Sequence, residues 1–228
     1  IPEIDGSDEF FEAETVDPAL QRNFTIIVPA HEYDLNPHTA SYSSESQILS
    51  SLYEGLFSYD PVTLEPKNAL AARYRISRNK KRWTFTLRKN AKFSDGLPLT
   101  ARDVCDAWLD LLAEPRAPYS SMFDIIEGAA AYRSGKGKRN AVGIRALSDT
   151  TLVVELASPA GYLPRVLCHS AFSVYKKDTS VSSGAFSMQR NSNGEMILIK
   201  NNNYWDAEHT HIERIAIVQS DDADENAF

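Results

Sequence analysis

Alternating apolar and polar residues predict a strand over residues 83–88, WTFTLR. A period of two places Trp83, Phe85 and Leu87 on one face, and we expect that face to be buried. Other short apolar runs bounded by turn residues predict further strands, at 24–28, within 62–88, at 143–147, 151–156 and 172–175, on either side of RNSNG (190–194), and at 212–219.

A helical period follows the turn at Asp95-Gly96. Thr100 is a good N-cap, and Asp103 three residues later approximates a capping box. The apolar residues that follow form one stripe at helical spacing: Val104, Trp108, Leu111 and Leu112. This helix should end near Glu114-Pro115, because a residue before proline avoids helical geometry. The same spacing predicts other helices at 47–57, around 124–132, and from about 161 to 169.

The length and composition describe a folded protein. The 228 residues are 43% hydrophobic and 24% charged, enough for one large domain or two smaller ones. The formal net charge is −7, but residues 1–22 alone contribute −6, and we interpret this segment as a solvated acidic linker. The remaining body is near −1, which gives little electrostatic reason to expect nucleic acid or an anionic membrane as partner.

The side chains that carry metal or redox chemistry are few. Cys105 and Cys168 lie in apolar surroundings and read as small core residues. His209 and His211 could place two imidazoles on one side of an extended segment, but no cysteine or third histidine is near them. Three other features lack the spacing that their chemistry needs: the glycines of 135–138 for phosphate, the carboxylates of 221–225 for calcium, and the serines for nucleophilic catalysis. We therefore expect no enzyme activity and no cofactor.

Seven motifs run along the chain in a recognisable order: LNPHTA (35–40), SSLYEGLFSYDP (50–61), WTFTLRKNAKFSDGLPLTARDV (83–104), APYSS (117–121), GIRALSDTTLVVELASP (143–159), SGAFSM (183–188) and NNNYWD (201–206). In this order the sequence resembles the oligopeptide and dipeptide solute-binding proteins of bacterial ABC importers. The likeness covers about residues 24–220.

The resemblance implies a fold. It is an α/β, periplasmic-binding-protein-like (type II) lobe of mixed sheet and helices, with an inserted α+β structural domain. On this basis residues 1–23 are the acidic linker, 24–57 plus 158–228 form the first ligand lobe, incomplete here, and 58–157 form the inserted domain. The second lobe of the family is absent from this chain, so we expect either a fragment or a shortened member. Strands from the two first-lobe segments should share a sheet.

The resemblance also implies a function, the capture of oligopeptides outside the cytoplasm for an ABC importer. A receptor for many peptides should hold the shared backbone, by adding the ligand as an extended strand between two lobes. Ser41, Tyr42 and Ser43 occupy the loop whose main chain pairs with peptide in the family, and Tyr119 reaches the ligand from the inserted domain. Ser183 stands where the family often has asparagine before glycine.

The expected partners follow from the same likeness: an oligopeptide ligand and the membrane permease of the importer, but no nucleic acid. We expect a monomer on the periplasmic or extracytoplasmic face of the cell membrane, held there only through an N-terminal lipid anchor that the present sequence lacks. Two alternatives stay open. The same fold could bind another solute, such as nickel, haem or an opine, or it could serve as a non-transport surface or scaffolding protein with an incomplete site.

Overall fold

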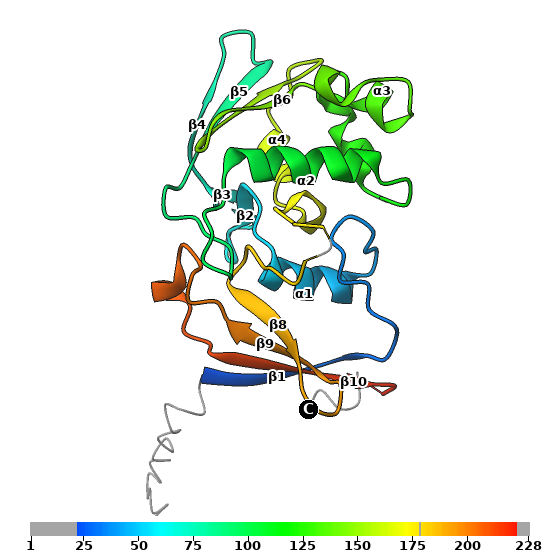
Figure 1. Cartoon of the computed structure of the whole chain (residues 1–228), viewed down its shortest axis with the longest axis vertical. Helices are drawn as coiled ribbons and strands as arrows, with labels where there is room; N and C mark the ends of the chain where they lie inside the picture. Colours follow the sequence, from blue (N-terminus) through cyan, green and yellow to red (C-terminus); the bar gives the residue numbers. More distant parts are fainter. Residues whose placement is uncertain (1–21, 178, 223–228) are drawn as a thin grey trace, which may run out of the picture.

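Two four-stranded sheets lie at opposite ends of the molecule, with helices packed between them (Figure 1). This computed structural model describes residues 22–177 and 179–222. One sheet, here called the terminal sheet, is built from the two ends of the described chain. The other, the insert sheet, is built from its middle. We call the parts of the molecule around them the lobe unit and the insert unit.

The terminal sheet has the order β1-β10-β9-β8. Its strands are β1 (Asn23–Pro29), β8 (Phe186–Arg190), β9 (Met196–Lys200) and β10 (Arg214–Ser220). The first and last strands run parallel, with Asn23 opposite Arg214 and Pro29 opposite Ser220. The prediction that the two segments share a sheet is therefore confirmed. Helix α1 (Ser43–Leu52) covers this sheet through buried Ile48 and Leu49.

The insert sheet has the order β4-β5-β7-β6, and all its neighbours are antiparallel. Its strands are β4 (Ala71–Ile76), β5 (Arg82–Leu87), β6 (Ile144–Ser148) and β7 (Thr151–Glu155). Trp83, Phe85 and Leu87 are buried as the alternation predicts. Helix α2 (Ala101–Ala113) covers them with its apolar stripe, and its predicted cap is present, because the Thr100 hydroxyl accepts a hydrogen bond from the Asp103 amide.

Short elements complete the chain. They are β2 (Phe57–Tyr59), β3 (Pro66–Asn68), α3 (Ala129–Arg133), α4 (Leu163–Val166) and the 3-10 turns η2 (Ser120–Ile125), η3 (Arg139–Ala141), η4 (Ser170–Phe172) and η5 (Ala207–His209). None of the helices among residues 22–177 and 179–222 has the length and apolar character needed to cross a bilayer.

Four predicted elements differ from the structure. The helix predicted around 124–132 is divided into the 3-10 turn η2 and the short helix α3, and the helix predicted from about 161 to 169 is limited to Leu163–Val166. The helix predicted over 47–57 begins at Ser43 and ends at Leu52, because the Glu45 carboxylate accepts a hydrogen bond from the amide of the N-cap residue Tyr42, and Tyr53 turns the backbone to extended geometry. Leu56, the last apolar residue of the predicted stripe, packs in the other core instead. The strand predicted over 172–175 is wrong. Phe172 ends the turn η4, and the apolar character of this stretch reflects burial rather than sheet pairing.

The predicted boundary at residue 158 also needs correction. Ala160, Leu163 and Leu167 are buried in the core of the insert unit, as are Phe172 and Val174. The indole nitrogen of Trp108 on α2 even donates to the Phe172 carbonyl at 2.8 Å. Turn residues at 158–161 therefore bend the chain without separating two cores, and the chain returns to the lobe unit only after residue 174.

Both cysteines belong with the insert core. Cys105 is buried, Cys168 packs partly buried against the same cluster, and both are free thiols. The predicted lobe segment, 158–228, placed Cys168 in the first lobe. That placement is wrong, because the chain stays in the insert unit until residue 174. The predicted acidic linker lies outside the described residues, except for positions 22 and 23.

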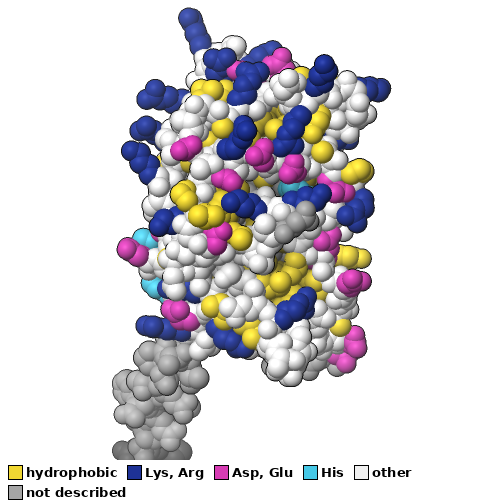
Figure 2. All heavy atoms as spheres, viewed as in Figure 1, with side chains coloured by type: hydrophobic (Ala, Val, Ile, Leu, Met, Phe, Trp, Pro, Cys, Tyr) yellow, Lys and Arg dark blue, Asp and Glu magenta, His cyan; other side chains and the backbone are white. Residues whose placement is uncertain are grey.

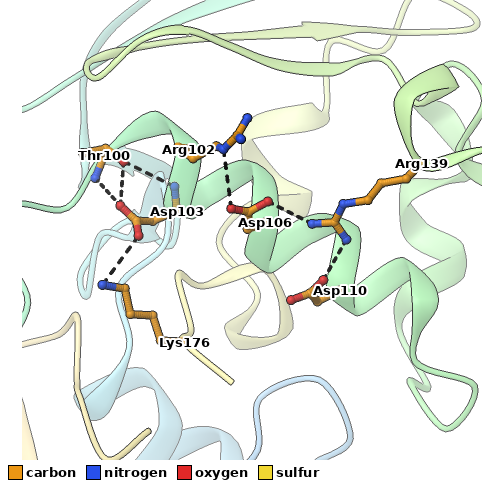
Figure 3. Close-up of polar contacts among 7 residues, drawn as sticks. All are labelled: Thr100, Arg102, Asp103, Asp106, Asp110, Arg139 and Lys176. Atoms are coloured by element: carbon orange, nitrogen blue, oxygen red, sulfur yellow. Dashed lines mark hydrogen bonds and ion pairs between the residues drawn. The ribbon is translucent and has the colours of Figure 1, made fainter. Parts of the chain in front are cut away.

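The corner at residues 90–104 joins the two units. The Asn90 side chain donates to the Trp205 carbonyl at 3.1 Å, and the Asn203 side chain donates to the Ser94 carbonyl at 3.0 Å. On α2, Asp103 pairs with Lys176 at 3.6 Å, as Figure 3 shows. These contacts fasten the insert unit to segments that lie far along the chain.

Candidate functional site

A hollow of about 450 Å³ opens where β1 ends and α1 begins. Its walls are the end of the strand, the loop after it and the first turn of the helix: Ile27, Val28, Pro29, His31, Tyr42, Ser43, Ser44 and Gln47. The lining offers hydroxyl and amide groups beside apolar side chains. Tyr42 stands out at its rim with 62% of its surface exposed.

Glu45 organises the loop that forms this wall. Its carboxylate is buried and accepts hydrogen bonds from three backbone amides, those of Asp34, Ser41 and Tyr42, at 2.8 to 3.0 Å. Helix α1 places Glu45 in its first turn, where the helix dipole favours a negative charge. One side chain therefore fixes both ends of the loop between β1 and α1.

An aromatic group borders the hollow on the same side. The His31 ring stacks on Tyr33 with centroids 3.9 Å apart and lies 4.9 Å from the Tyr42 ring. His31 Nε2 is 4.0 Å from the Glu45 carboxylate, and this buried nitrogen has no hydrogen-bond partner among the described residues. The rings give the rim a flat apolar surface with one polar atom near its base.

The structure brings together the first three predicted ligand residues. Tyr42 and Ser43 line the hollow, and Ser41 precedes them on the exposed loop. The amides of Ser41 and Tyr42 are engaged by Glu45, so these two main-chain donors are already used within the loop. A ligand here would meet the exposed side chains of this loop and the end of β1.

Tyr119 lies in the insert unit and is not part of this wall. It precedes η2, is partly buried against the insert core and packs on the His169 ring at 4.2 Å. Its ligand contact stays a prediction.

Ser183 is buried inside the molecule rather than at a surface. Its hydroxyl donates to the Val174 carbonyl at 2.6 Å and accepts from the Glu54 amide at 3.0 Å. These bonds join the chain segment that leaves α1 to the two that return from the insert unit. The Ser183 side chain therefore holds these segments together, and a ligand contact by Ser183 stays a prediction.

Sequence reasoning missed His31, Gln47 and Glu45. The signal for Glu45 was present, since an acid three residues after a helix cap is a recognised pattern, but the helix was predicted to begin later. The wall residues of β1 carry no sequence signal, because only the fold places the end of that strand beside α1.

Two further hollows and one histidine pair lie outside this wall. A hollow of about 280 Å³ lies at the β8–β9 turn and β10, and one of about 410 Å³ lies beside Trp83 and Gly161. His209 and His211 are not part of a metal-ligand cluster, since residues 22–177 and 179–222 hold no group of three potential metal ligands. His209 instead contacts the Asp206 carboxylate at 2.6 Å.

Comparison with known proteins gives a consistent result. Residues 65–227 match the family described as "Bacterial extracellular solute-binding proteins, family 5 Middle". The dipeptide-binding protein DppE of Bacillus subtilis is 34% identical over 200 residues, covering 80% of this chain and 36% of the relative. The periplasmic oligopeptide-binding protein OppA of Salmonella typhimurium is 31% identical over 214 residues, covering 85% of this chain and 39% of the relative.

A solved structure agrees with the sequence comparisons. Listeria monocytogenes OppA bound to peptide superimposes with a TM-score of 0.81 at 25% identity, covering 87% of this chain and 42% of that one. Its fold is that of the type II periplasmic binding proteins, which confirms the predicted fold class. The present chain spans less than half the length of these relatives.

Proposed function

The chain belongs to the bacterial extracellular solute-binding proteins of family 5, and from this we propose that it is the peptide-capturing part of a receptor for an ABC importer. The two relatives described above are a dipeptide-binding and an oligopeptide-binding protein, and the structural neighbour was solved with peptide bound. Members of this family are extracellular solute-binding proteins, and we infer that this chain binds a solute and does not catalyse a reaction.

The hollow at the Tyr42 loop is the observation that carries this proposal. Its lining is mostly uncharged, with backbone, hydroxyl and amide groups next to apolar surface. Such a surface suits the polar, neutral backbone that all peptides share. Glu45 holds the loop rigid before any ligand arrives, and preorganisation of this kind lowers the entropy that binding must overcome.

The remaining parts of the proposal concern the setting of the protein. The receptor acts as a monomer, hands its peptide to a membrane permease, and is held at the membrane by an N-terminal lipid anchor. The ligand is enclosed between this lobe and a second one, so that closure depends on contacts with both. Ser41, Tyr42 and Ser43 are the residues of this lobe nearest the peptide, with Tyr119 and Ser183 as secondary candidates.

The test uses the full-length natural protein that contains this chain. Ligands released on unfolding are identified by mass spectrometry, and calorimetry then measures the affinity for those ligands. We expect short peptides, and we expect Tyr42→Ala to weaken their binding at least about tenfold, since exposed aromatic anchors dominate many binding surfaces. Tyr162→Ala is the matched control, because Tyr162 is 56% exposed but lies in the other unit.

Other outcomes would decide against the proposal. Release of a metal ion, a haem or an opine instead of peptides would favour the same fold serving another solute. Equal effects of the two tyrosine substitutions would remove the hollow from the ligand site.

A further inference from the structure

Charge is unevenly divided along the chain. Residues 66–157 contain 17 Lys and Arg against 9 Asp and Glu, a net charge of +8, while the rest of the chain carries −15. The whole-chain value of −7 hides this separation. Figure 2 shows Lys and Arg side chains crowded over the upper part of the molecule, where Figure 1 places the insert sheet.

Four exposed arginines gather on one face of the insert sheet, and we call them the arginine face. They come from three strands: Arg73 and Arg75 on β4, Arg82 on β5 and Arg145 on β6. Side chains alternate across a strand, so these arginines point away from α2 and the buried Trp83 and Phe85.

The register places the arginines across the full width of the sheet. Arg75 lies opposite Thr84, Thr84 opposite Val153, and Val153 opposite Arg145. Arg75 and Arg145 therefore stand in one row at the two edges of the sheet, roughly 14 Å apart for strands spaced by about 4.8 Å. Between them the row holds the partly exposed Thr84 and the buried Val153, and neither side chain is charged.

Most acidic residues of the insert unit that form ion pairs do so with cations outside the arginine face. Arg139 binds both Asp106 and Asp110, and Asp103 pairs with Lys176, all on the helix side of the sheet (Figure 3). On the arginine face itself, Glu155 pairs with Arg82 at 2.5 Å. Three of the four arginines, Arg73, Arg75 and Arg145, form no ion pair among the described residues, and Asp149 in the β6–β7 turn is the acid at the border of the face.

We propose that the arginine face is a docking surface for a bilayer of anionic lipids. A broad array of cations without ion-pair partners complements the phosphates of such a bilayer, and each cation near its surface adds to the attraction. Leu147 follows Arg145 and is 67% exposed, so an apolar side chain stands beside the cations, where it can enter the headgroup region.

Nucleic acid fits this surface less well. Proteins that bind single strands offer aromatic side chains on which bases stack, and the aromatic residues of this sheet, Tyr74, Trp83 and Phe85, pack together on the opposite face, where Trp83 and Phe85 are buried and Tyr74 is 40% exposed. Duplex recognition places a helix or a two-stranded ribbon in a groove, whereas these arginines are spread across the width of a four-stranded sheet.

The docking surface is independent of the peptide site, since it lies on the other unit and uses none of the hollow's residues. It adds a second membrane contact to the proposed lipid anchor. A receptor that lies on the bilayer would search for its permease in two dimensions rather than three. The failure of one proposal would leave the other standing, because peptide affinity and vesicle binding are measured separately.

The experiment is a co-sedimentation assay with the full chain. One set of vesicles contains equal parts of phosphatidylglycerol and phosphatidylcholine, and the other contains phosphatidylcholine alone. We expect binding to the anionic vesicles only, weakening as salt screens the charges. Arg73→Gln, Arg75→Gln and Arg145→Gln together should weaken this binding at least about tenfold.

A matched variant controls for net charge. Arg22→Gln, Lys177→Gln and Arg190→Gln remove the same three charges from exposed positions of the lobe unit. This control should bind within about twofold of the parent chain if the face, rather than overall charge, directs binding. Circular dichroism checks that both variants fold, as substitutions at exposed sites should allow.

Three results would overturn the proposal. These are equal binding to neutral and anionic vesicles, equal losses in the two triple variants, and binding to a soluble polyanion such as RNA without binding to anionic vesicles. The last result would assign the face to a different class of partner.

Discussion

The Tyr204 hydroxyl donates a hydrogen bond to the Glu54 carboxylate, joining positions 150 residues apart. Glu54 lies just after α1, and Tyr204 lies in the segment that the corner at 90–104 also holds. The Arg88 guanidinium, 3.6 Å above the neighbouring Trp205 ring, adds a cation to the same junction. The contact between the two units therefore includes a partly buried carboxylate.

That burial raises the pKa of Glu54 to about 7, and the bond from Tyr204 partly opposes the rise. A carboxyl with a raised pKa in the folded state keeps a proton that the unfolded chain loses. Its stabilising contribution is therefore complete below about pH 4.5 and is lost as the pH rises through 7. In Glu54→Gln this part of the pH dependence should disappear, as urea unfolding at several pH values will show.

Tyr204→Phe tests the other side of the hydrogen bond to Glu54. It removes the hydrogen bond to the carboxylate, so it should cost about 1 kcal/mol of unfolding free energy and shift the Glu54 midpoint upward. If the variant's stability follows the same pH curve as the parent, the junction does not control the ionisation of Glu54.

The ionisation of His38 should make the protein less stable as the pH falls, which is opposite to the effect of Glu54. Burial lowers its pKa to about 4, against the attraction of Asp110 and Glu114, which favours the charged form. The unfolded chain gains this proton first, so stability is complete above pH 6.5 and falls as the pH drops toward 4, by up to about 3 kcal/mol. His38→Phe keeps an aromatic contact with Tyr175 and should flatten this slope in urea titrations.

The exposed His209 is the control for that measurement. It contacts Asp206 at the surface, which raises rather than lowers its pKa. His209→Gln should leave the loss of stability between pH 6.5 and 4 unchanged, and an equal flattening in both variants would point to a general charge effect.

Glu45→Gln tests the organisation of the candidate site. A glutamine has one oxygen acceptor for three amide donors, and its own NH₂ group would face them. We expect a loss of about 1–3 kcal/mol in unfolding free energy. Peptide affinity of the full-length protein should fall with it, whereas Glu127→Gln in the insert unit should change neither property. Unchanged affinity in Glu45→Gln would show that the loop needs no such support.

Gly184→Ala tests how closely two segments approach. A Cβ at this position would lie 2.7 Å from the Ser51 carbonyl oxygen and 2.9 Å from that of Leu52, and backbone atoms cannot move aside cheaply. The substitution should cost at least about 2 kcal/mol in thermal or chemical unfolding. Gly161→Ala is the matched control, since a Cβ there meets no atom within 4 Å and should change stability little.

Turn residues and hydrophobic periodicity allowed part of the fold to be predicted from the sequence. The corner, α2 with its cap and stripe, and the hairpin of β6 and β7 depend on turn residues and periodicity that neighbouring positions supply. The end of α1 was mistaken because Leu56 continues the helical spacing while serving a different core. Periodicity reports burial, and it cannot say which core receives a side chain.

The candidate site was less readable for a related reason. Tyr42 and Ser43 were found through resemblance, but their neighbours Val28 and His31 join them only after β1 and α1 have packed together. The arginine face was missed because charges were summed along the chain. Four arginines scattered between positions 73 and 145 become one surface only when the register of the insert sheet aligns them.

The parallel pairing of β1 with β10 has a consequence for how the chain acquires its structure. Strand β1 can pair only after β10 has been synthesised, because Asn23 lies opposite Arg214, about 190 residues later in the chain. The insert sheet is complete much earlier, since its two hairpins close over short distances and the pair that joins them, β5 with β7, needs the chain only as far as Glu155. During synthesis β1 is thus an unpaired, half-apolar strand beside a finished insert unit, and this interval is when the chain is most exposed to aggregation.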